Sequence, residues 1–233
     1  MIIRSREPAF RYIFCFAALR KRMPLQSGLA VSSSPAKQCT RSSAASITIG
    51  LAIFTRNDFL NMTILNSTRD DIPEIFRLYQ LATEYQKKTF PDNLWPEFDR
   101  ELIETEVAEN HQFKLMIDGK IACVWAITFN DEIIWPEDDG VSSVYIHRIA
   151  TNPDFRGNDL VKKIAEWAKE YATSLGKKYV RLDTCGDNTR LINHYQKCGF
   201  EFLGLKHLHD SAGLPPHYED ADVCYFEIKL DNA

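Results

Sequence analysis

The fold of this chain is decided by residues 143–176, SVYIHRIATNPDFRGNDLVKKIAEWAKEYATSLG. The first part predicts a strand, Ser143–Thr151, which Asn152-Pro153 interrupts. An amphipathic helix follows, because one apolar stripe recurs at helical spacing: Leu160, Ile164, Ala168, Tyr171 and Leu175. Gly176 is typical of a helix C-terminus, and Tyr179–Thr184 predicts the next strand. A strand, a helix and a strand in this order predict two parallel strands joined by a right-handed crossover.

The chain before this unit predicts one strand, two helices and a hairpin. The expected elements are a strand at Thr63–Asn66, a helix that follows a capping box at Ser67–Asp70 and starts near Ile72, a second helix at Phe98–Glu109, and a hairpin of Gln112–Ile117 with Lys120–Phe129. Asp118-Gly119 supplies the turn of the hairpin. Ile121–Ile127 is apolar at every position, which indicates a strand buried on both faces.

The chain after this unit predicts a short helix and two more strands. The helix is expected at Asn188–Cys198 and ends at Gly199, and the strands are expected at Phe200–Leu205 and Val223–Leu230. Hairpins make antiparallel neighbours, whereas the strand–helix–strand unit makes a parallel pair. We therefore expect an α/β (α+β) fold with a mixed, mostly antiparallel central sheet of about seven strands, flanked by about four helices.

Charge divides the chain into two parts. The 233 residues carry a formal net charge of −4 at pH 7, but residues 1–61 hold nine Lys and Arg against two Asp and Glu, and residues 62–233 hold 19 against 30. Such a break marks a change of architecture. We expect one folded domain at 62–230 and an N-terminal extension at 1–61. The extension is either disordered, an Arg- and Ser-rich organellar targeting segment, or upstream sequence that is not native.

Charge, apolar runs and cysteine spacing indicate the compartment in which the protein is expected. No basic excess points to nucleic acid, and the apolar run Tyr12–Leu19 is too short to span a bilayer. None of the six cysteines forms a C-x-x-C pair, which argues against a structural zinc site and suits a reducing compartment. We therefore expect a cytoplasmic protein, with organellar targeting by residues 1–61 as the alternative.

Two separated motifs resemble the GNAT superfamily of N-acetyltransferases. One is IHRIATNPDFRG at Ile146–Gly157 together with the helix that follows, and the other is NTRLINHYQKCGFEFLG at Asn188–Gly204. The resemblance covers nearly all of residues 62–230, including the order of the elements. It implies a GNAT-like fold and acetyl-CoA as the co-substrate.

The resemblance also implies where acetyl-CoA binds. Its pyrophosphate is expected at the start of the helix after Asn152-Pro153, where backbone N–H groups and the helix dipole favour an anion. The residues of this loop are Arg156, Gly157, Asn158, Asp159, Leu160 and Val161. Backbone groups of Ile149, Ala150 and Thr151 are expected to pair with the pantetheine arm as an added strand would. Asn188 resembles a residue that contacts the same arm.

The pyrophosphate loop departs from the family pattern at two positions. Members of the family usually have small residues where this chain has Asp159 and Val161. Asp tolerates a left-handed backbone, but its charge repels a phosphate if the carboxylate points at it. The alternative to an active enzyme is therefore a non-catalytic binding or regulatory module, which keeps the fold but has a degraded loop.

Tyr195 is the candidate general acid. It stands in HYQKCGF, which resembles the motif of the tyrosine that protonates the departing CoA thiolate in many family members. The bland alternative is a core aromatic residue at helical spacing from Leu191.

The general base is harder to identify. Period-2 alternation places Tyr145, His147 and Ile149 on one face of their strand. His147 could accept a proton from an amine, although histidines on strands are often structural. Glu132 and Asp183 are weaker candidates, and a base that acts through water is also open.

The resemblance, with these residues in their implied roles, implies direct transfer of an acetyl group from acetyl-CoA to a primary amine of a small molecule or protein. The net charge of −11 over residues 62–233 hints at a cationic acceptor. We expect no nucleic-acid or membrane partner, and a homodimer is compatible with the sequence. No metal is expected, because His207, His209, Asp210 and His217 lack a ligand spacing. Their loop and Phe90–Trp95 are expected to shape the acceptor pocket.

Overall fold

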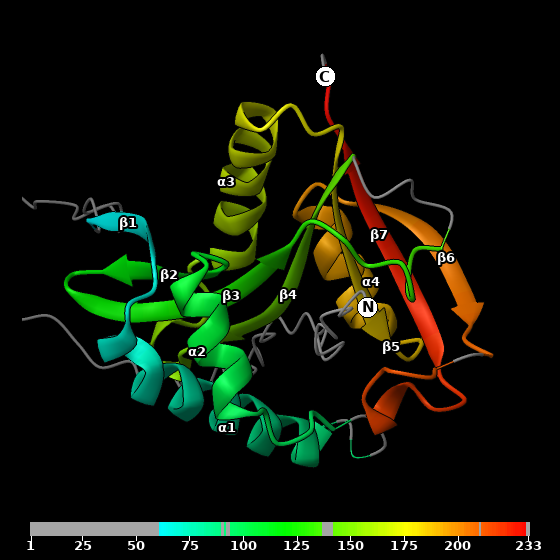
Figure 1. Ribbon diagram of the computed structural model, residues 1–233, viewed down its shortest axis with the longest axis horizontal. Coiled ribbons are helices and arrows are strands. Elements are labelled where there is room, and N and C mark those ends of the chain that lie inside the picture. The colour runs from blue at the N-terminus through cyan, green and yellow to red at the C-terminus, as the bar shows by residue number, and fades with distance from the viewer. Residues whose placement is uncertain (1–60, 90, 92–93, 137–141, 210, 232–233) are drawn as a thin grey trace, which may run out of the picture.

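A seven-stranded sheet carries the fold, with its strands in the order β1-β2-β3-β4-β5-β7-β6 (Figure 1). This computed structural model describes residues 61–89, 91, 94–136, 142–209 and 211–231. The strands are β1 (Met62–Asn66), β2 (Gln112–Ile117), β3 (Lys120–Thr128), β4 (Ser143–Thr151), β5 (Tyr179–Cys185), β6 (Glu201–His207) and β7 (Asp222–Lys229). Neighbours are antiparallel except β4 and β5, which run parallel. The predicted mixed sheet is confirmed, and the predicted extension lies outside the described residues except for Asn61.

Two helices cover each face of the sheet (Figure 1). The helices are α1 (Ile72–Thr89) and α2 (Arg100–Ala108) on one face, and α3 (Leu160–Ser174) and α4 (Thr189–Lys197) on the other. Ile75 of α1 shares a hydrophobic core with Tyr145 of β4, whereas Ile164 of α3 shares a second core with Ile146. Consecutive residues of β4 therefore face different cores, as expected of a strand buried on both faces.

The capping box before α1 lies one residue later than the sequence predicted. Thr68 and Asp71 form it, since the backbone N–H and the hydroxyl of Thr68 donate to Asp71 Oδ2 at 2.7 and 2.8 Å. The N–H of Ser67 donates to the carbonyl oxygen of Gln112 at 2.8 Å, so it does not make the bond to the Asp70 side chain that the predicted box requires. Pairing with β2 thus extends past β1 by one residue and places the capping box at Thr68, whereas α1 begins at Ile72 as predicted.

A β-bulge interrupts β4 at its centre. Ala150 pairs with Val124 and His147 with Ala126, so two residues of β4, Arg148 and Ile149, lie opposite the single residue Trp125. Arg148 has a φ of 52°, in the left-handed region that residues other than glycine seldom adopt.

The bulge corrects the predicted face of β4. After it, Ile149 packs in the same core as Val144 and Ile146, so it does not share a face with Tyr145 and His147. Simple alternation failed there because the extra residue reverses which side chains face which core. Neither glycine nor proline marks the position in the sequence.

The central parallel pair is short, because β4 and β5 separate soon after they begin. Their register runs from Ser143 opposite Tyr179 to Tyr145 opposite Arg181, and both strands continue for several residues beyond it. Figure 1 shows the two strands turning apart along their length. We call the point just after Tyr145 and Arg181 the fork.

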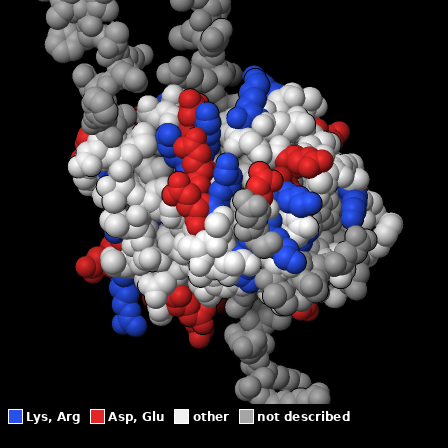
Figure 2. Space-filling view, turned by 90° about the horizontal axis from the view of Figure 1, so that it is seen from above, with Lys and Arg blue, Asp and Glu red and all other residues white. Residues whose placement is uncertain are grey.

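Charged side chains of both signs share the side of the molecule seen in Figure 2. Within the described part of the chain, no helix is both long and apolar enough to cross a membrane. Figure 2 shows Lys and Arg side chains interleaved with Asp and Glu side chains. A polyanion such as nucleic acid would therefore meet no uniformly basic field on this face.

Candidate active site

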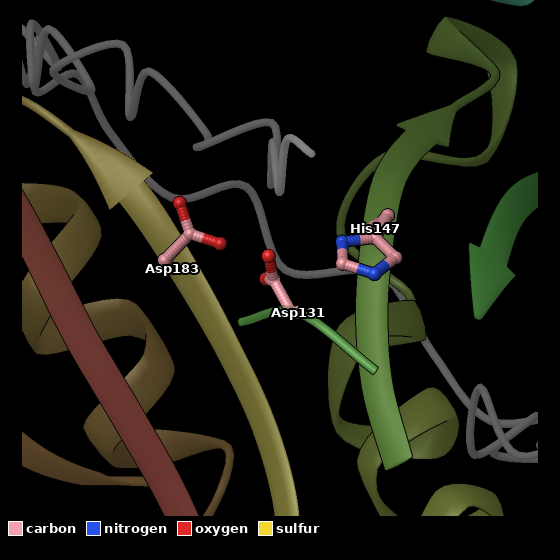
Figure 3. Close-up of side chains that lie close together, drawn as sticks. All are labelled: Asp131, His147 and Asp183. Carbon is pink, nitrogen blue, oxygen red and sulfur yellow. The ribbon is translucent and has the colours of Figure 1, made fainter. Parts of the chain in front are cut away.

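A buried cluster of three side chains lies at the fork. His147 stands two residues past the last paired residue of β4, and Asp183 stands two residues past that of β5. Asp131 comes from the turn after β3 and lies between them (Figure 3). One nitrogen or oxygen of each side chain lies within 4.8 Å of those of the other two. The cluster can therefore contact one small cation with all three groups, which is how buried negative charge is usually compensated.

The imidazole of His147 is held in a defined orientation. Its Nε2 lies 2.7 Å from the hydroxyl oxygen of Thr128, and that hydroxyl donates to the carbonyl oxygen of Asn130 at 3.0 Å. Because the Thr128 proton is used in this second bond, Nε2 carries the proton that completes the first. The neutral ring then has its acceptor nitrogen at Nδ1, as a proton-accepting histidine requires.

The two carboxylates are each held by one hydrogen bond to a neighbouring segment. The Tyr218 hydroxyl donates to Asp183 Oδ2 at 2.9 Å, and the N–H of Ile134 donates to Asp131. Tyr218 is fully buried and belongs to a short helical turn, Pro216–Tyr218, between β6 and β7. Among the described residues, Oδ2 of Asp131 and Oδ1 of Asp183 have no hydrogen-bond partner.

Burial makes both carboxyl groups weak acids. It raises the pKa of Asp183 to about 7, against the hydrogen bond from Tyr218 that lowers it. It also raises the pKa of Asp131 well above the ordinary value, and the Asp183 carboxylate raises it further. A group with a pKa of about 7, such as Asp183, exchanges protons near neutral pH, which is typical of functional sites.

The sequence predicted this cluster only in part. It singled out His147, and it treated Asp183 as a weaker candidate although a carboxylate in the otherwise largely apolar segment LDTC was a usable signal. Asp131 and Tyr218 were missed because both lie in connections whose path the sequence pattern does not reveal.

The start of α3 presents unpaired backbone donors. The first hydrogen bond of the helix runs from the N–H of Lys163 to the carbonyl oxygen of Asp159. The N–H groups of Leu160 and Val161 therefore have no acceptor within the helix. Leu160 and Val161 are both buried in the core under α3, so the larger side chain at Val161 points away from the loop.

Asp159 occupies the position before α3 in a left-handed conformation, with φ 51° and ψ 38°. Its side chain makes no capping hydrogen bond and is exposed. Burial lowers the pKa of His194, and the nearby Asp159 carboxylate opposes this effect. The Asp159 carboxylate thus lies close to His194 of α4.

Arg156 and Gly157 stand just before this turn. The guanidinium carbon of Arg156 lies 4.8 Å from the ring centroid of Tyr85, which ties the loop to the end of α1. Gly157 has a φ of 85°, and Asn158 donates to the carbonyl oxygen of Phe155. The predicted loop residues are therefore brought together at one helix end.

Asn188 and Tyr195 lie on α4 and its cap. Oδ1 of Asn188 accepts from the N–H groups of Arg190 and Leu191, which caps α4. Tyr195 is fully buried against Phe200 and Phe226 in the core under α3 and α4. Tyr195 therefore lies on the face covered by α3 and α4, whereas His147 stacks with Tyr145, which packs in the core of the other face.

His207 and His209 lie side by side at the end of β6, with ring centroids 4.7 Å apart, but His217 lies in a separate turn, Pro216–Tyr218. His207 lies between Asp220 and Asp222, at 3.1 and 3.0 Å, whereas His217 packs on Tyr218. Burial lowers the pKa of His217 to about 4. Within the described residues, these histidines belong to no group with metal-ligand spacing, and Asp210 lies outside the described residues.

The described cysteines are poor nucleophiles. Cys123, Cys185, Cys198 and Cys224 are free thiols. Burial raises the pKa of Cys123 to about 12 and those of Cys198 and Cys224 to about 11. A thiol attacks as its thiolate, so these groups offer no activated nucleophile at neutral pH.

The chain is similar in sequence to members of the acetyltransferase (GNAT) family. Residues 73–200 match the model of the acetyltransferase (GNAT) family. The uncharacterized N-acetyltransferase YesJ of Bacillus subtilis is 28% identical over 102 residues, which cover 42% of this chain and 57% of YesJ. The uncharacterized N-acetyltransferase MJ1207 of Methanocaldococcus jannaschii is 29% identical over 142 residues, 60% of each chain. The matched region thus spans less than two thirds of either relative.

Solved structures share the fold at lower identity. A GNAT-family acetyltransferase from Listeria monocytogenes aligns with a TM-score of 0.58 and 20% identity, over 72% of this chain and 95% of the other. YncA of Salmonella typhimurium, whose structure holds its cofactor acetyl-CoA, aligns with a TM-score of 0.54 and 17% identity, over 74% and 95%. Both alignments cover nearly the whole of the compared chain.

Proposed function

Because the chain belongs to the GNAT family of acetyltransferases, we propose that it transfers an acetyl group from acetyl-CoA to a primary amine of a small molecule or protein. The observation that carries the proposal is the fork. There the two central strands separate beside proton-accepting side chains, and β4 leads on to the helix end with unpaired N–H groups. A donor and an acceptor can meet at that point from opposite faces of the sheet.

In this proposal acetyl-CoA lies along the second half of β4. The pyrophosphate contacts the loop from Arg156 to Val161, where backbone N–H groups and the helix dipole favour it. The pantetheine arm pairs with Ile149–Thr151 on the edge that faces β5, and Asn188 is close to the arm through its amide nitrogen. That edge has no strand partner past Tyr145 among the described residues.

The chemistry is direct transfer. The neutral amine attacks the thioester carbonyl carbon, backbone donors stabilise the oxyanion, and the C–S bond breaks. Tyr195 returns a proton to the sulfur as a positioned general acid. No covalent enzyme intermediate is required, in keeping with the high pKa values of the buried thiols.

Acetyl-CoA is expected to stabilise the full chain against heat. At about 100 times its dissociation constant, a ligand that binds only the folded state adds about 2.7 kcal/mol, which raises Tm by roughly 5–10 °C for a domain of this size. The measurement is a thermal unfolding scan with increasing acetyl-CoA. Pantetheine at the same concentrations is the control, because it lacks the pyrophosphate and should shift Tm much less. Equal shifts from both compounds, or none up to millimolar acetyl-CoA, would contradict the proposed site.

Replacement of Asp159 by glycine is expected to tighten acetyl-CoA binding. The change removes an exposed negative charge beside the proposed pyrophosphate site, worth about 1 kcal/mol at 4 Å in water, or roughly fivefold in Kd. It also places glycine where the backbone is left-handed. Calorimetric titration of both proteins at low and high salt tests this, since screening should reduce the difference.

The matched control is Asp118→Gly in the turn between β2 and β3. Asp118 is also exposed and left-handed, with a φ of 49°, but it lies in the turn between β2 and β3 and not in the proposed loop. Its replacement should leave the Kd unchanged. If both variants changed the Kd equally, the effect would not come from the proposed loop.

A second candidate function is a non-catalytic binding or regulatory module. The charged side chain of Asp159 at the loop is the feature that favours it. In that case acetyl-CoA binding would be weak in the natural chain and restored in Asp159→Gly, and neither protein would transfer an acetyl group.

A further inference from the structure

Asp131 and Asp183 place two buried carboxylates side by side at the fork. They come from separate segments, the turn after β3 and the strand β5, and are 8% and 1% exposed. One oxygen of each has no hydrogen-bond partner among the described residues. Two buried carboxylates lower the free energy of unfolding unless a bound cation compensates their charge.

The titratable side chains that face this pair are one histidine, two cysteines and two tyrosines. They are His147 on β4, Cys185 on β5, Tyr218 in the β6–β7 connection, and Tyr225 and Cys224 on β7. Among the described residues, no Lys or Arg contributes to the pKa of Asp131 or Asp183. Arg181, two residues before Asp183, pairs instead with Glu227 at 2.8 Å. No neighbouring cation among the described residues therefore appears among the causes of the two raised pKa values.

We propose that Asp131 and Asp183 form the subsite that receives the ammonium group of a cationic amine acceptor and takes its first proton. The inference rests on the proposed acetyl transfer and specifies its acceptor as an alkylammonium. One carboxylate oxygen each of Asp131 and Asp183 and one imidazole nitrogen of His147 lie within 4.8 Å of one another, close enough to contact one ammonium nitrogen. Tyr218 acts as a positioning residue, because its hydroxyl donates to Oδ2 of Asp183.

The proton balance of the step is complete. An N–H bond of the ammonium group breaks and its proton moves to a carboxylate oxygen of the pair, which leaves a neutral amine with a lone pair. The nitrogen then bonds to the thioester carbonyl carbon, and the C–S bond breaks. A second N–H proton leaves as the amide forms and offsets the proton that sulfur receives. The pair releases the first proton to solvent, as the overall reaction requires.

The carboxyl pKa values support this role. A carboxyl with a pKa of about 7, such as Asp183, accepts a proton far more readily than an exposed aspartate. The pair must be able to take up a proton, so kcat/KM for an ammonium acceptor should fall about tenfold per pH unit below about pH 7.

The first test does not depend on acetyl transfer. In the full chain labelled with 13C at its Asp carboxyls, the signals of Asp131 and Asp183 are assigned by loss in Asp131→Asn and Asp183→Asn. We expect both to titrate above the ordinary aspartate range, and we expect benzylamine, an ammonium ion at pH 7, to shift them. Ordinary titration near pH 4, or no shift with benzylamine, would overturn the proposal.

The second test separates proton transfer from a structural role. Benzylamine enters as an ammonium ion, whereas 4-methoxyaniline is already neutral at pH 7. Asp131→Asn and Asp183→Asn should lower kcat/KM for benzylamine about 100-fold and change it far less for 4-methoxyaniline, with acetyl-CoA binding unchanged. Equal losses for both amines would overturn the proposal. Glu219→Gln, an exposed charge change beside Tyr218, should leave both rates unchanged.

Two further outcomes are decisive. If the natural chain acetylated no amine although benzylamine still shifted the two carboxyl signals, the proposed function would fail while the ammonium subsite stood. If the purified protein carried one zinc, iron or manganese ion per chain by elemental analysis, and Asp183→Asn removed it, the carboxylates would belong to that ion and the proposal would be wrong.

Discussion

Replacement of Arg148 by methionine is expected to lower the free energy of unfolding by about 3–5 kcal/mol. Arg148 and Glu106 form an ion pair whose side chains are 1% and 7% exposed. The Arg148 guanidinium also donates to the Tyr79 hydroxyl at 3.4 Å and lies over the Phe98 ring. Without the cation, the Glu106 carboxylate is buried and uncompensated, which is the costly case for a buried pair.

A second substitution at Glu106 should restore the stability that Arg148→Met loses. Replacing both partners, Arg148→Met with Glu106→Leu, removes the stranded charge and should recover most of the lost stability. Urea unfolding at pH 7 measures both variants. The control is Lys163→Met, which breaks an exposed pair with Glu166 and should cost at most about 1 kcal/mol. A loss in Arg148→Met no larger than in this control would show that the pair does not anchor the bulge to α1 and α2.

Replacement of Asp183 by asparagine is expected to stabilise the protein at neutral and alkaline pH while impairing its proposed activity. The folded-state pKa of Asp183 is raised by burial to about 7, from an ordinary 3.8. The folded state therefore binds this proton more tightly than the unfolded state. The contribution of this proton to the free energy of unfolding is fully present below about pH 4, decreases as pH rises, and is lost above about pH 7.

The size of the effect follows from the shift in pKa. About three pKa units lower the free energy of unfolding by on the order of 4 kcal/mol above pH 7. At pH 5 this penalty is about 2 kcal/mol smaller. Asparagine has no charge to bury and can still accept the Tyr218 hydrogen bond. The advantage of Asp183→Asn over the natural chain should therefore be larger at pH 8 than at pH 5.

Urea unfolding at these two pH values decides the matter. Glu219→Gln serves as the control, because Glu219 is exposed and its replacement should follow the natural chain at both. An advantage of Asp183→Asn that was the same at pH 5 and pH 8 would mean that the buried carboxyl does not titrate as described.

Most of the fold could be predicted from the sequence because its elements follow from local patterns. The crossover from β4 through α3 to β5 depends on the break at Asn152-Pro153, on the apolar stripe of α3 and on Gly176, and each is visible in the sequence. The bulge at Arg148 could not be predicted, since tertiary contacts with Glu106 and Tyr79 hold it. Such contacts join residues 42 and 69 positions apart.

In the candidate site too, the part that is contiguous in sequence could be predicted and the part that tertiary structure assembles could not. The loop from Arg156 to Val161 is contiguous in sequence, and a motif could identify it. The cluster at the fork joins Asp131, His147 and Asp183 from three segments, so only the register of β4 and β5 brings it together. Sequence alternation placed His147 on the correct side of β4 because the bulge begins after it.

The central claim is that this chain moves an acetyl group from acetyl-CoA to an amine at the fork. The most direct test incubates the full chain with acetyl-CoA labelled with 13C in the acetyl group and a panel of alkylamines, polyamines and lysine-containing peptides. Free thiol and labelled amide are then measured together. We predict one labelled amide for each thiol released, with at least one cationic amine, and a large loss of both in Asp183→Asn. Binding of acetyl-CoA without amide formation from any amine, or thiol release that does not depend on an amine, would contradict the account.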